Sequence, residues 1–159
     1  MSSGFILAYV CIMLVVFIVV LAQINNKKRE IQDTIKGLAD NTLEMTPEEF
    51  MQMRSYSFAG RKSYARTMNF PGVYILHNKT KNMYYVGQGK NVLDRVNCHF
   101  NGKGNGDVYA DYKYGDIFTI RMIGLENSGY DTLNELERNT IMTYDAYRNG
   151  YNKTRGNRG

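Results

Sequence analysis

Three side chains in the second half of the chain have types and spacings suited to chemistry at a phosphate group. Arg95 and His99 are four residues apart, so on a helix they lie on one face. The Arg95 guanidinium carries a permanent charge and a fork of donors that matches phosphate oxygens. Glu137 offers hard carboxylate oxygens, and one protein carboxylate with several waters is typical of Mg²⁺. If the fold brings them together, these types could serve metal-assisted chemistry at a phosphate group.

Two tyrosines and an asparagine stand in glycine-containing triplets, Gly72-Val73-Tyr74, Tyr85-Val86-Gly87 and Gly150-Tyr151-Asn152. Taken singly, each has an ordinary explanation. In a chain with 13 tyrosines, Tyr74 and Tyr85 would be packing residues of a hairpin, and Asn152 a turn residue. Arg95 would be a surface cation, and Glu137 a solvated carboxylate. Their order along the chain and the elements that carry them decide between these interpretations.

A hairpin and a third strand are predicted around the triplets. Residues 71–78 are rich in β-branched and aromatic side chains, and 83–87 form the return strand after a polar turn at 79–82. Residues 116–125 contain a dense apolar run and are predicted to form the third strand. Between hairpin and third strand, a glycine-rich turn at 101–106 leads into a polar stretch that ends near Tyr114.

Two helices are predicted to carry the charged candidates. Asn91 can cap a helix that runs to about Phe100, with Asp94 three residues on as its reciprocal partner. Thr132 to Glu135 form a capping box that opens a helix to about Asn149, and Gly150 ends it.

Five elements in this order resemble the signature of the GIY-YIG nuclease family. The triplets at 72–74 and 85–87 resemble its two halves, with Val in place of Ile in each. The resemblance continues to about residue 157 through three further elements: the arginine-bearing helix (Arg95 with His99-Phe100), the metal-binding glutamate (Glu137) and the closing Gly-Tyr-Asn (150–152).

The resemblance implies an α/β (α+β) fold, a three-stranded antiparallel sheet flanked by helices. It implies a divalent-metal-dependent endonuclease that hydrolyses phosphodiester bonds, with Mg²⁺ (or Mn²⁺) bound by Glu137 and DNA as substrate. It also implies a set of catalytic residues: Tyr74, Tyr85, Arg95, His99, Glu137 and Asn152.

Individual roles follow from the same resemblance. Tyr74 would be the general base or would orient the attacking water, and Tyr85 would position the phosphate or share that role. An unperturbed tyrosine has a pKa of about 10, so the base role requires a metal-bound water or Arg95 to lower it. His99 would position phosphate or assist proton transfer. Asn152 would hold Tyr74 or its loop by side-chain hydrogen bonds.

The N-terminal segment 5–22 consists of 18 consecutive residues without charge, Pro, Asn or Gln. As a helix it would be about 27 Å long, close to the hydrocarbon thickness of a bilayer. A cleaved signal peptide is the alternative, but the apolar run is long and no Lys or Arg precedes it. We therefore expect a single-pass membrane helix. Lys27, Lys28 and Arg29 follow it, which predicts an N-terminus outside and a cytoplasmic nuclease domain.

Residues 23–69 are predicted to be a helical, basic linker to a nuclease domain at 70–159. Ile31, Ile35 and Leu38 recur at helical spacing, with an end expected near Gly37 or Asn41. A second helix is expected to start at 46–49. A basic-aromatic stretch at 54–66 would either contact nucleic acid or acidic headgroups, or pack on the domain as a linker, which we favour.

The amino-acid composition adds little to the prediction of function. The chain has 20 Lys and Arg against 15 Asp and Glu, which fits a polyanionic ligand without requiring one. Two distant cysteines, Cys11 and Cys98, argue against a structural zinc site and a disulfide. A small module of this kind would bind DNA through phosphate contacts, with low sequence specificity or with specificity from a protein partner. The candidate contacts are Lys90, Lys103, Lys113, Lys153, Arg155 and Arg158.

Two other functions fit the same sequence. One is a catalytically weak module that binds nucleic acid and tethers DNA at the membrane; the other is an anchored scaffold for a protein partner. Intact Tyr74, Arg95 and Glu137 favour the nuclease over the binding module. The scaffold would be favoured if salt-sensitive DNA binding were undetectable at low ionic strength.

Overall fold

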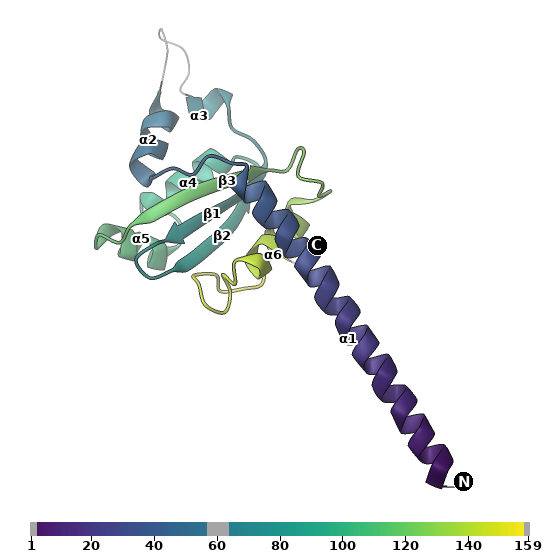
Figure 1. Cartoon of the computed structure of the whole chain (residues 1–159). Helices are drawn as coiled ribbons and strands as arrows, with labels where there is room; N and C mark the ends of the chain where they lie inside the picture. Colours follow the sequence, from purple (N-terminus) through teal and green to yellow (C-terminus); the bar gives the residue numbers. More distant parts are fainter. Residues whose placement is uncertain (1–2, 57–63, 158–159) are drawn as a thin grey trace.

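The structure is a computed structural model that describes residues 3–56 and 64–157. Its centre is an antiparallel sheet of three strands, β1 (Gly72–Asn78), β2 (Met83–Gly89) and β3 (Phe118–Gly124), in the order β2-β1-β3 (Figure 1). The predicted hairpin, third strand and helix-flanked sheet are therefore confirmed. β1 lies between the other two strands, and its side chains are buried on both faces of the sheet. β2 forms an edge of the sheet.

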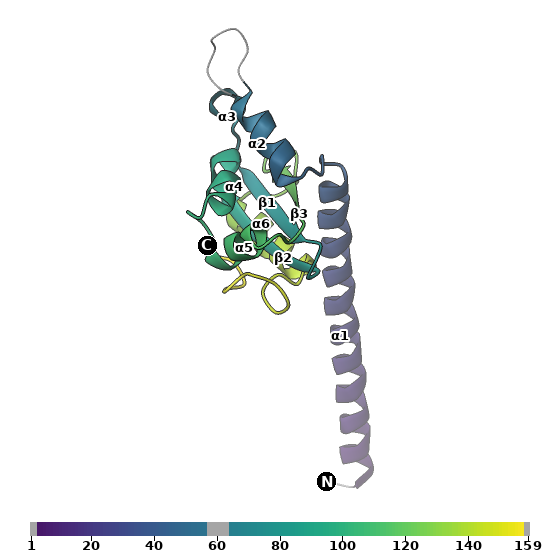
Figure 2. The same ribbon diagram turned by 90° about the vertical axis from the view of Figure 1, so that its left-hand side faces the viewer.

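Helices cover both faces of the sheet (Figure 2). On one face, Tyr74 and Leu76 pack with α2 (Pro47–Ser55), α4 (Val92–Phe100) and α5 (Gly106–Lys113). On the other face, Val73 and Ile75 pack with the end of α1 (Ser3–Asp40) and with α6 (Leu133–Thr143). The short α3 (Tyr64–Thr67) contributes Ala65 to the first of these cores.

α1 is one continuous helix that runs from the apolar segment into the core of the domain (Figure 1). Ile35 and Ala39 are fully buried against the second face of the sheet, so this part of the predicted linker belongs to the domain core. Gly37 does not interrupt the helix, which ends at Asp40, beside the expected Asn41. Between Ala8 and Asp40 the helix is long and apolar enough to cross a membrane, and its side chains from 8 to 30 are exposed.

The segment that follows α1 also packs on the domain. α2 starts where the sequence predicts, and Thr46 and Glu49 form a capping box there, with hydrogen bonds of 3.2 and 2.7 Å. α2 buries Phe50, and Arg54 forms an ion pair with Asp94 of α4 at 2.7 Å. Phe58, Arg61 and Lys62 of the basic-aromatic stretch lie outside the described residues.

The predicted cap of α4 is wrong. Asn91 precedes the helix, but its side chain makes no capping hydrogen bond. Asn69 supplies the acceptor instead, because its Oδ1 receives the Leu93 N–H at 2.9 Å. Asp94 is not a reciprocal partner of Asn91, since its carboxylate binds Arg54 and Asn69.

Two other boundaries differ from the prediction. The polar stretch before Tyr114 is largely the helix α5, whose first N–H groups are capped by Asn105 Oδ1. α6 is capped by the Thr132 side chain as expected, but the described contacts lack the reciprocal Glu135 bond of the predicted capping box. The helix ends at Thr143 instead of near Asn149. Asp145 adopts a φ of 50°, and the Ala146 N–H reaches back to the Ile141 carbonyl at 3.0 Å. This is a Schellman ending with aspartate in the position that glycine usually holds.

Candidate active site

Both glycines of the two triplets lie where the backbone comes too close to a neighbour for a side chain. The β1–β2 register places Gly87 directly opposite Tyr74. A Cβ atom on Gly87 would meet the hydroxyl and ring of Tyr74. A Cβ atom on Gly72 would lie 2.5 Å from the carbonyl oxygen of Ile123 in β3. The spacing of the triplets thus follows from hairpin pairing, in which one glycine provides space for the tyrosine of the other triplet.

Tyr74, Tyr85 and His99 form one aromatic cluster on the α4 face of the sheet. The Tyr74 hydroxyl and His99 Nε2 are hydrogen-bonded at 2.8 Å, and both side chains are buried. The Tyr85 ring is half-buried and lies 4.7 Å from the His99 ring and 6.2 Å from the Tyr74 ring, between centroids. The structure therefore brings these three predicted site residues into direct contact.

A loop that the sequence did not single out fixes the orientation of His99. The backbone N–H of Asn105 donates to His99 Nδ1 at 2.9 Å. The loop can approach this closely because residue 104 is glycine, where a Cβ would lie 2.6 Å from Nδ1. Since Nδ1 accepts, the neutral ring carries its proton on Nε2 and donates to the Tyr74 hydroxyl oxygen. The available signal was Asn105 as a helix cap, which the prediction of a polar stretch overlooked.

Burial controls the charge of this cluster. It raises the pKa of Tyr74 well above its usual value of 10, and nearby Tyr85 raises that pKa further. The charge and hydrogen bond of Arg95 oppose this rise. Burial, with the charge of Arg95, lowers the pKa of His99 to about 4. Tyr74 and His99 are therefore both uncharged at neutral pH, so His99 acts as a donor to Tyr74 and not as its proton acceptor.

Arg95 connects this buried cluster to solvent. It lies on α4 one turn before His99, and its residue is exposed. The aliphatic part of the side chain passes over Gly89, where a Cβ would lie 2.6 Å from Arg95 Cγ. The guanidinium is near enough to Tyr74 to lower the pKa of its hydroxyl. It is thus available to a phosphate while adjoining the Tyr74 oxygen.

Glu137 approaches the cluster from the other face of the sheet. It lies on α6, is 8% exposed, and accepts a hydrogen bond from Gln88 Nε2 at 2.9 Å. Gln88 also donates to Asn134 Oδ1 at 2.7 Å, so a side chain of edge strand β2 holds the carboxylate. The charge of Glu137 contributes to the raised pKa of Tyr85, after burial as the main cause. The candidate site therefore surrounds the edge of β2.

A divalent cation fits Glu137 by its donor chemistry. The carboxylate is nearly buried, and within the described part of the chain no Lys or Arg forms an ion pair with it. A buried carboxylate without a cationic partner is unfavourable unless a cation joins it. Among the described residues there is no group of three or more His, Cys, Asp or Glu for a metal ion. One carboxylate with water suits Mg²⁺ better than zinc.

Asn152 acts on the strand and not on Tyr74. Its Oδ1 accepts the Val86 N–H at 2.9 Å, and its Nδ2 donates to the Val86 carbonyl at 2.7 Å. The preceding Tyr151 N–H donates to the Tyr84 carbonyl at 2.9 Å. The closing triplet thus satisfies the outer backbone groups of β2, the strand that carries Tyr85 and Gly87. Asn152 is a positioning residue in this geometry.

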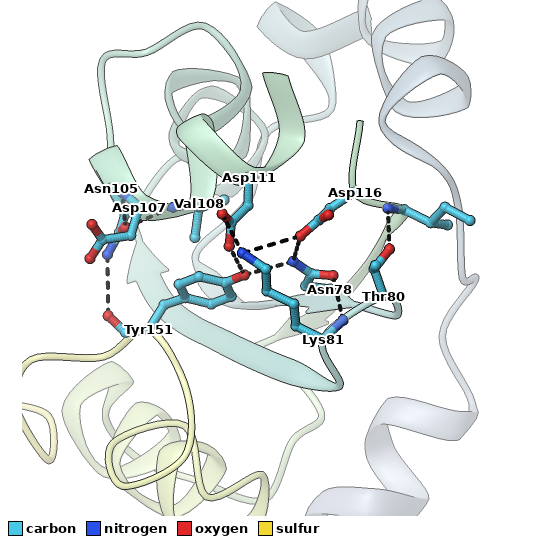
Figure 3. Close-up of polar contacts among 10 residues, drawn as sticks. Asn78, Thr80, Lys81, Asn105, Asp107, Val108, Asp111, Asp116 and Tyr151 are labelled. Atoms are coloured by element: carbon cyan, nitrogen blue, oxygen red, sulfur yellow. Dashed lines mark hydrogen bonds and ion pairs between the residues drawn. The ribbon is translucent and has the colours of Figure 1, made fainter. Parts of the chain in front are cut away.

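A polar network holds the closing triplet in place (Figure 3). The Tyr151 hydroxyl donates to Asp111 of α5 at 2.6 Å and accepts from Asn78 of β1 at 2.7 Å. Asn78 also donates to Asp116, and Lys81 forms ion pairs with both aspartates. The network joins α5, the hairpin turn and the C-terminal segment. Of its members, only Tyr151 was singled out from the sequence, as part of the closing triplet.

Comparison with protein families identifies the domain. The GIY-YIG catalytic domain matches residues 70–152, just over half of the chain. The chain belongs to the GIY-YIG family. Its GIY-YIG domain is a nuclease domain, which confirms the prediction from the five ordered elements.

The GIY-YIG chain was also compared with individual proteins. Among solved structures it is similar to a mutant of the catalytic domain of the intron endonuclease I-TevI, with 26% identity and a TM-score of 0.43. The similarity covers 56% of this chain and 98% of that one. Comparison with curated proteins gives no match.

Replacing Gly87 by alanine is expected to destabilise the GIY-YIG domain and to lower its activity. The new Cβ would collide with Tyr74, whose ring is fully buried and has no space to retreat. Overpacking of this kind typically costs about 1–3 kcal/mol, to be measured by urea unfolding. Gly106→Ala is the matched control, because nothing lies within 4 Å of its Cβ position. Equal stability of the two variants would contradict the close approach.

Acidification is expected to lower the free energy of unfolding through His99. The folded-state pKa is lowered to about 4 from a usual value of 6.5. Between these values the unfolded chain binds more protons than the folded one, so this contribution is complete above 6.5 and is lost as the pH falls toward 4. Unfolding midpoints of the wild type and of His99→Gln across this range test it. The variant should show a flatter pH dependence, and parallel curves would refute the assignment.

Proposed function

We propose that this protein is a divalent-metal-dependent DNA endonuclease, held at the cytoplasmic face of a membrane by α1. The observation that supports it best is the convergence of Tyr74, His99, Arg95 and Glu137 at the edge of β2. Hydrogen-bond donors, a hydroxyl and a carboxylate meet there, and hydrolysis of a phosphodiester uses such groups to bind the phosphate, orient water and hold a metal. No described Lys or Arg forms an ion pair with the carboxylate.

In the proposed mechanism, the scissile phosphate binds to the guanidinium of Arg95. The Tyr74 hydroxyl oxygen, fixed by the His99 Nε2–H, orients the attacking water. Because burial raises the pKa of Tyr74, a free phenolate is unfavourable before substrate binds. Its role as a base therefore depends on the positive charge of Arg95. Tyr85, half-exposed beside His99, positions the phosphate.

Glu137 would hold the metal, with Gln88 keeping the carboxylate in place. When bound, Mg²⁺ or Mn²⁺ would stabilise negative charge that develops on the phosphate and the leaving oxygen. GIY-YIG nucleases are in general dependent on divalent metals, and the single buried carboxylate of this chain is consistent with that dependence.

Membrane attachment rests on α1. The described part of its apolar segment makes no buried contact with the domain, so lipid is its natural environment. Lys27, Lys28 and Arg29 lie on the domain side of this segment, which favours a cytoplasmic domain and an external N-terminus. Because α1 continues without a break into the core, the domain would be held close to the membrane surface.

Substrate specificity is proposed to be low. Lys90, Lys103, Lys113 and Lys153 are exposed, and contacts from such side chains to phosphates position DNA without reading its sequence. Lys153 is paired with Asp107, and Lys113 lies over the Tyr109 ring. Arg158 lies outside the described residues. A protein partner would supply any sequence preference.

Nicking of supercoiled plasmid by the detergent-solubilised full chain tests the function. We expect cleavage with Mg²⁺ or Mn²⁺ and none with a chelator. DNA binding without cleavage under every metal tested would favour the catalytically weak binding module instead. Absence of salt-sensitive DNA binding at low ionic strength would favour the scaffold for a protein partner. Resistance of the chain to alkaline extraction from membranes tests the anchor.

A further inference from the structure

A basic pocket of about 330 Å³ lies where α1 and α6 meet the C-terminal segment. It is separate from the candidate active site, which surrounds the edge of β2. Three segments far apart in the sequence form it, so its residues are brought together only by the fold. Its lining consists of cations, apolar side chains and one carboxylate: Lys28, Arg138, Ile141, Met142, Asp145, Tyr147, Arg148 and Arg155.

The C-terminal segment completes this pocket in a defined conformation. Gly156 has a φ of 98° and packs on α6, where a Cβ would lie 3.2 Å from the Arg138 Cα. This places the Arg155 guanidinium over the Tyr147 ring, 5.4 Å from its centroid. Arg155 was a candidate DNA contact in the sequence, and the structure places it in this pocket.

The charge of the pocket is unbalanced. Within the described part of the chain, Lys28, Arg138, Arg148 and Arg155 form no ion pair with an acidic residue. The single carboxylate, Asp145, accepts a hydrogen bond from Asn149. Four cations around one concave site repel each other unless an anion joins them. The pocket therefore fits a compact anion with several oxygen acceptors, which describes a phosphate group.

The location of the pocket identifies the source of that phosphate. Lys28 lies six residues after Ala22, the end of the apolar segment, which is about 9 Å along a helix. Anionic headgroups of the cytoplasmic leaflet attract basic groups within this range. The exposed side chains of Met142 and Tyr147 suit the glycerol region of a lipid. The cluster of Tyr74 and Arg95 lies on the opposite face of the sheet from α6. Glu137 precedes the pocket residue Arg138 on α6 but does not line the pocket, so the test below compares DNA binding with lipid binding.

We propose that this pocket binds the phosphate headgroup of an anionic phospholipid and fixes the domain against the membrane. The proposal rests on the membrane insertion of α1 proposed above. A lipid bound between α1 and α6 would prevent the domain from tilting about the helix. It would hold the DNA-binding face at a constant orientation to the membrane surface.

Binding of phosphatidylglycerol to the full chain in detergent micelles tests the proposal, with phosphatidylcholine and inorganic phosphate as comparisons. We expect preference for phosphatidylglycerol over both. Lys28→Gln and Arg148→Gln should each weaken its binding about five-fold, as expected for loss of about 1 kcal/mol per cation. Arg29→Gln is the matched control, because Arg29 directly follows Lys28 on α1 and does not line the pocket. Plasmid nicking should be unchanged in all three variants.

Several results would overturn the proposal that this pocket binds a lipid phosphate. One is an equal loss of lipid binding in Arg29→Gln, which would indicate diffuse attraction by juxtamembrane charge. Another is weaker DNA binding by Lys28→Gln and Arg148→Gln with unchanged lipid binding, which would make the pocket a DNA contact. Tighter binding of inorganic phosphate than of the lipid would also refute it. Release of the chain by alkaline extraction, with selective lipid binding retained, would overturn the proposed membrane insertion and leave the pocket supported.

Discussion

Tyr74→Phe is expected to lower the rate of plasmid nicking by about 10²–10⁴-fold, the usual contribution of a general acid–base group. The hydroxyl is the only polar group of Tyr74 that can contact the attacking water, and phenylalanine keeps the ring that fills the space opposite Gly87. DNA binding should be nearly unchanged, because Arg95 and the surface lysines remain. Single-turnover nicking with saturating enzyme measures the chemical step apart from binding.

The stability of this variant separates the role in catalysis from a role in folding. Loss of the hydroxyl leaves the His99 Nε2–H buried without its acceptor, which costs about 1–3 kcal/mol. The variant should therefore unfold at lower urea but remain folded under assay conditions. Tyr114→Phe, at a side chain that is 88% exposed, is the matched control and should change neither quantity. Nicking by folded Tyr74→Phe at the wild-type rate would refute the assignment of Tyr74.

The sequence was sufficient for features that depend on neighbouring residues. The hairpin follows from β-branched and aromatic residues on either side of a polar turn, and its register then places Tyr74 opposite Gly87. The capping box of α2 is likewise complete within four residues. The same holds for Arg95 and His99, because helical spacing alone puts them on adjacent turns facing one side.

Features that depend on distant partners could not be predicted in this way. The cap of α4 comes from Asn69, which lies on the other side of the hairpin in sequence, so Asn91 was the only local choice. The end of α6 carries Asp145 in a left-handed conformation without the usual glycine signal. The change of composition after residue 22 suggested a boundary, yet α1 continues because Ile35 and Ala39 are buried by the sheet.

The same distinction explains which site residues were found. Tyr74, Arg95 and Glu137 belong to a recognisable order of motifs, whereas Gln88 and Asn105 act through single hydrogen bonds made possible by the fold. Asn105 orients His99, and Gln88 holds Glu137, so each supports a predicted residue from a segment that the motifs do not mark. Asn152 was predicted as a site residue that holds Tyr74 or its loop. Its side chain instead makes both of its hydrogen bonds to the backbone of Val86.

Glu137→Gln is expected to remove metal-dependent nicking while leaving the fold intact. The glutamine amide can still accept the hydrogen bond from Gln88, so the packing of α6 on β2 is retained. Loss of the charge removes the carboxylate that the described part of the site offers to a cation. Stabilisation by the metal is worth several kcal/mol, or about 10²–10⁴-fold in rate. The measurement is nicking rate against Mg²⁺ concentration. Raising Mg²⁺ should not restore the wild-type rate.

Glu135→Gln provides the comparison that makes this result specific. Glu135 lies on the same helix two residues earlier, is only partly buried, and carries the same charge, so general effects on the field around α6 are matched. The Glu135→Gln variant should nick DNA at the wild-type rate with unchanged Mg²⁺ dependence. If both variants lose activity equally, the negative field of α6 attracts the metal and Glu137 has no special position. If neither does, the metal binds elsewhere, and the buried carboxylate without a cation serves only to orient Gln88 and the edge strand.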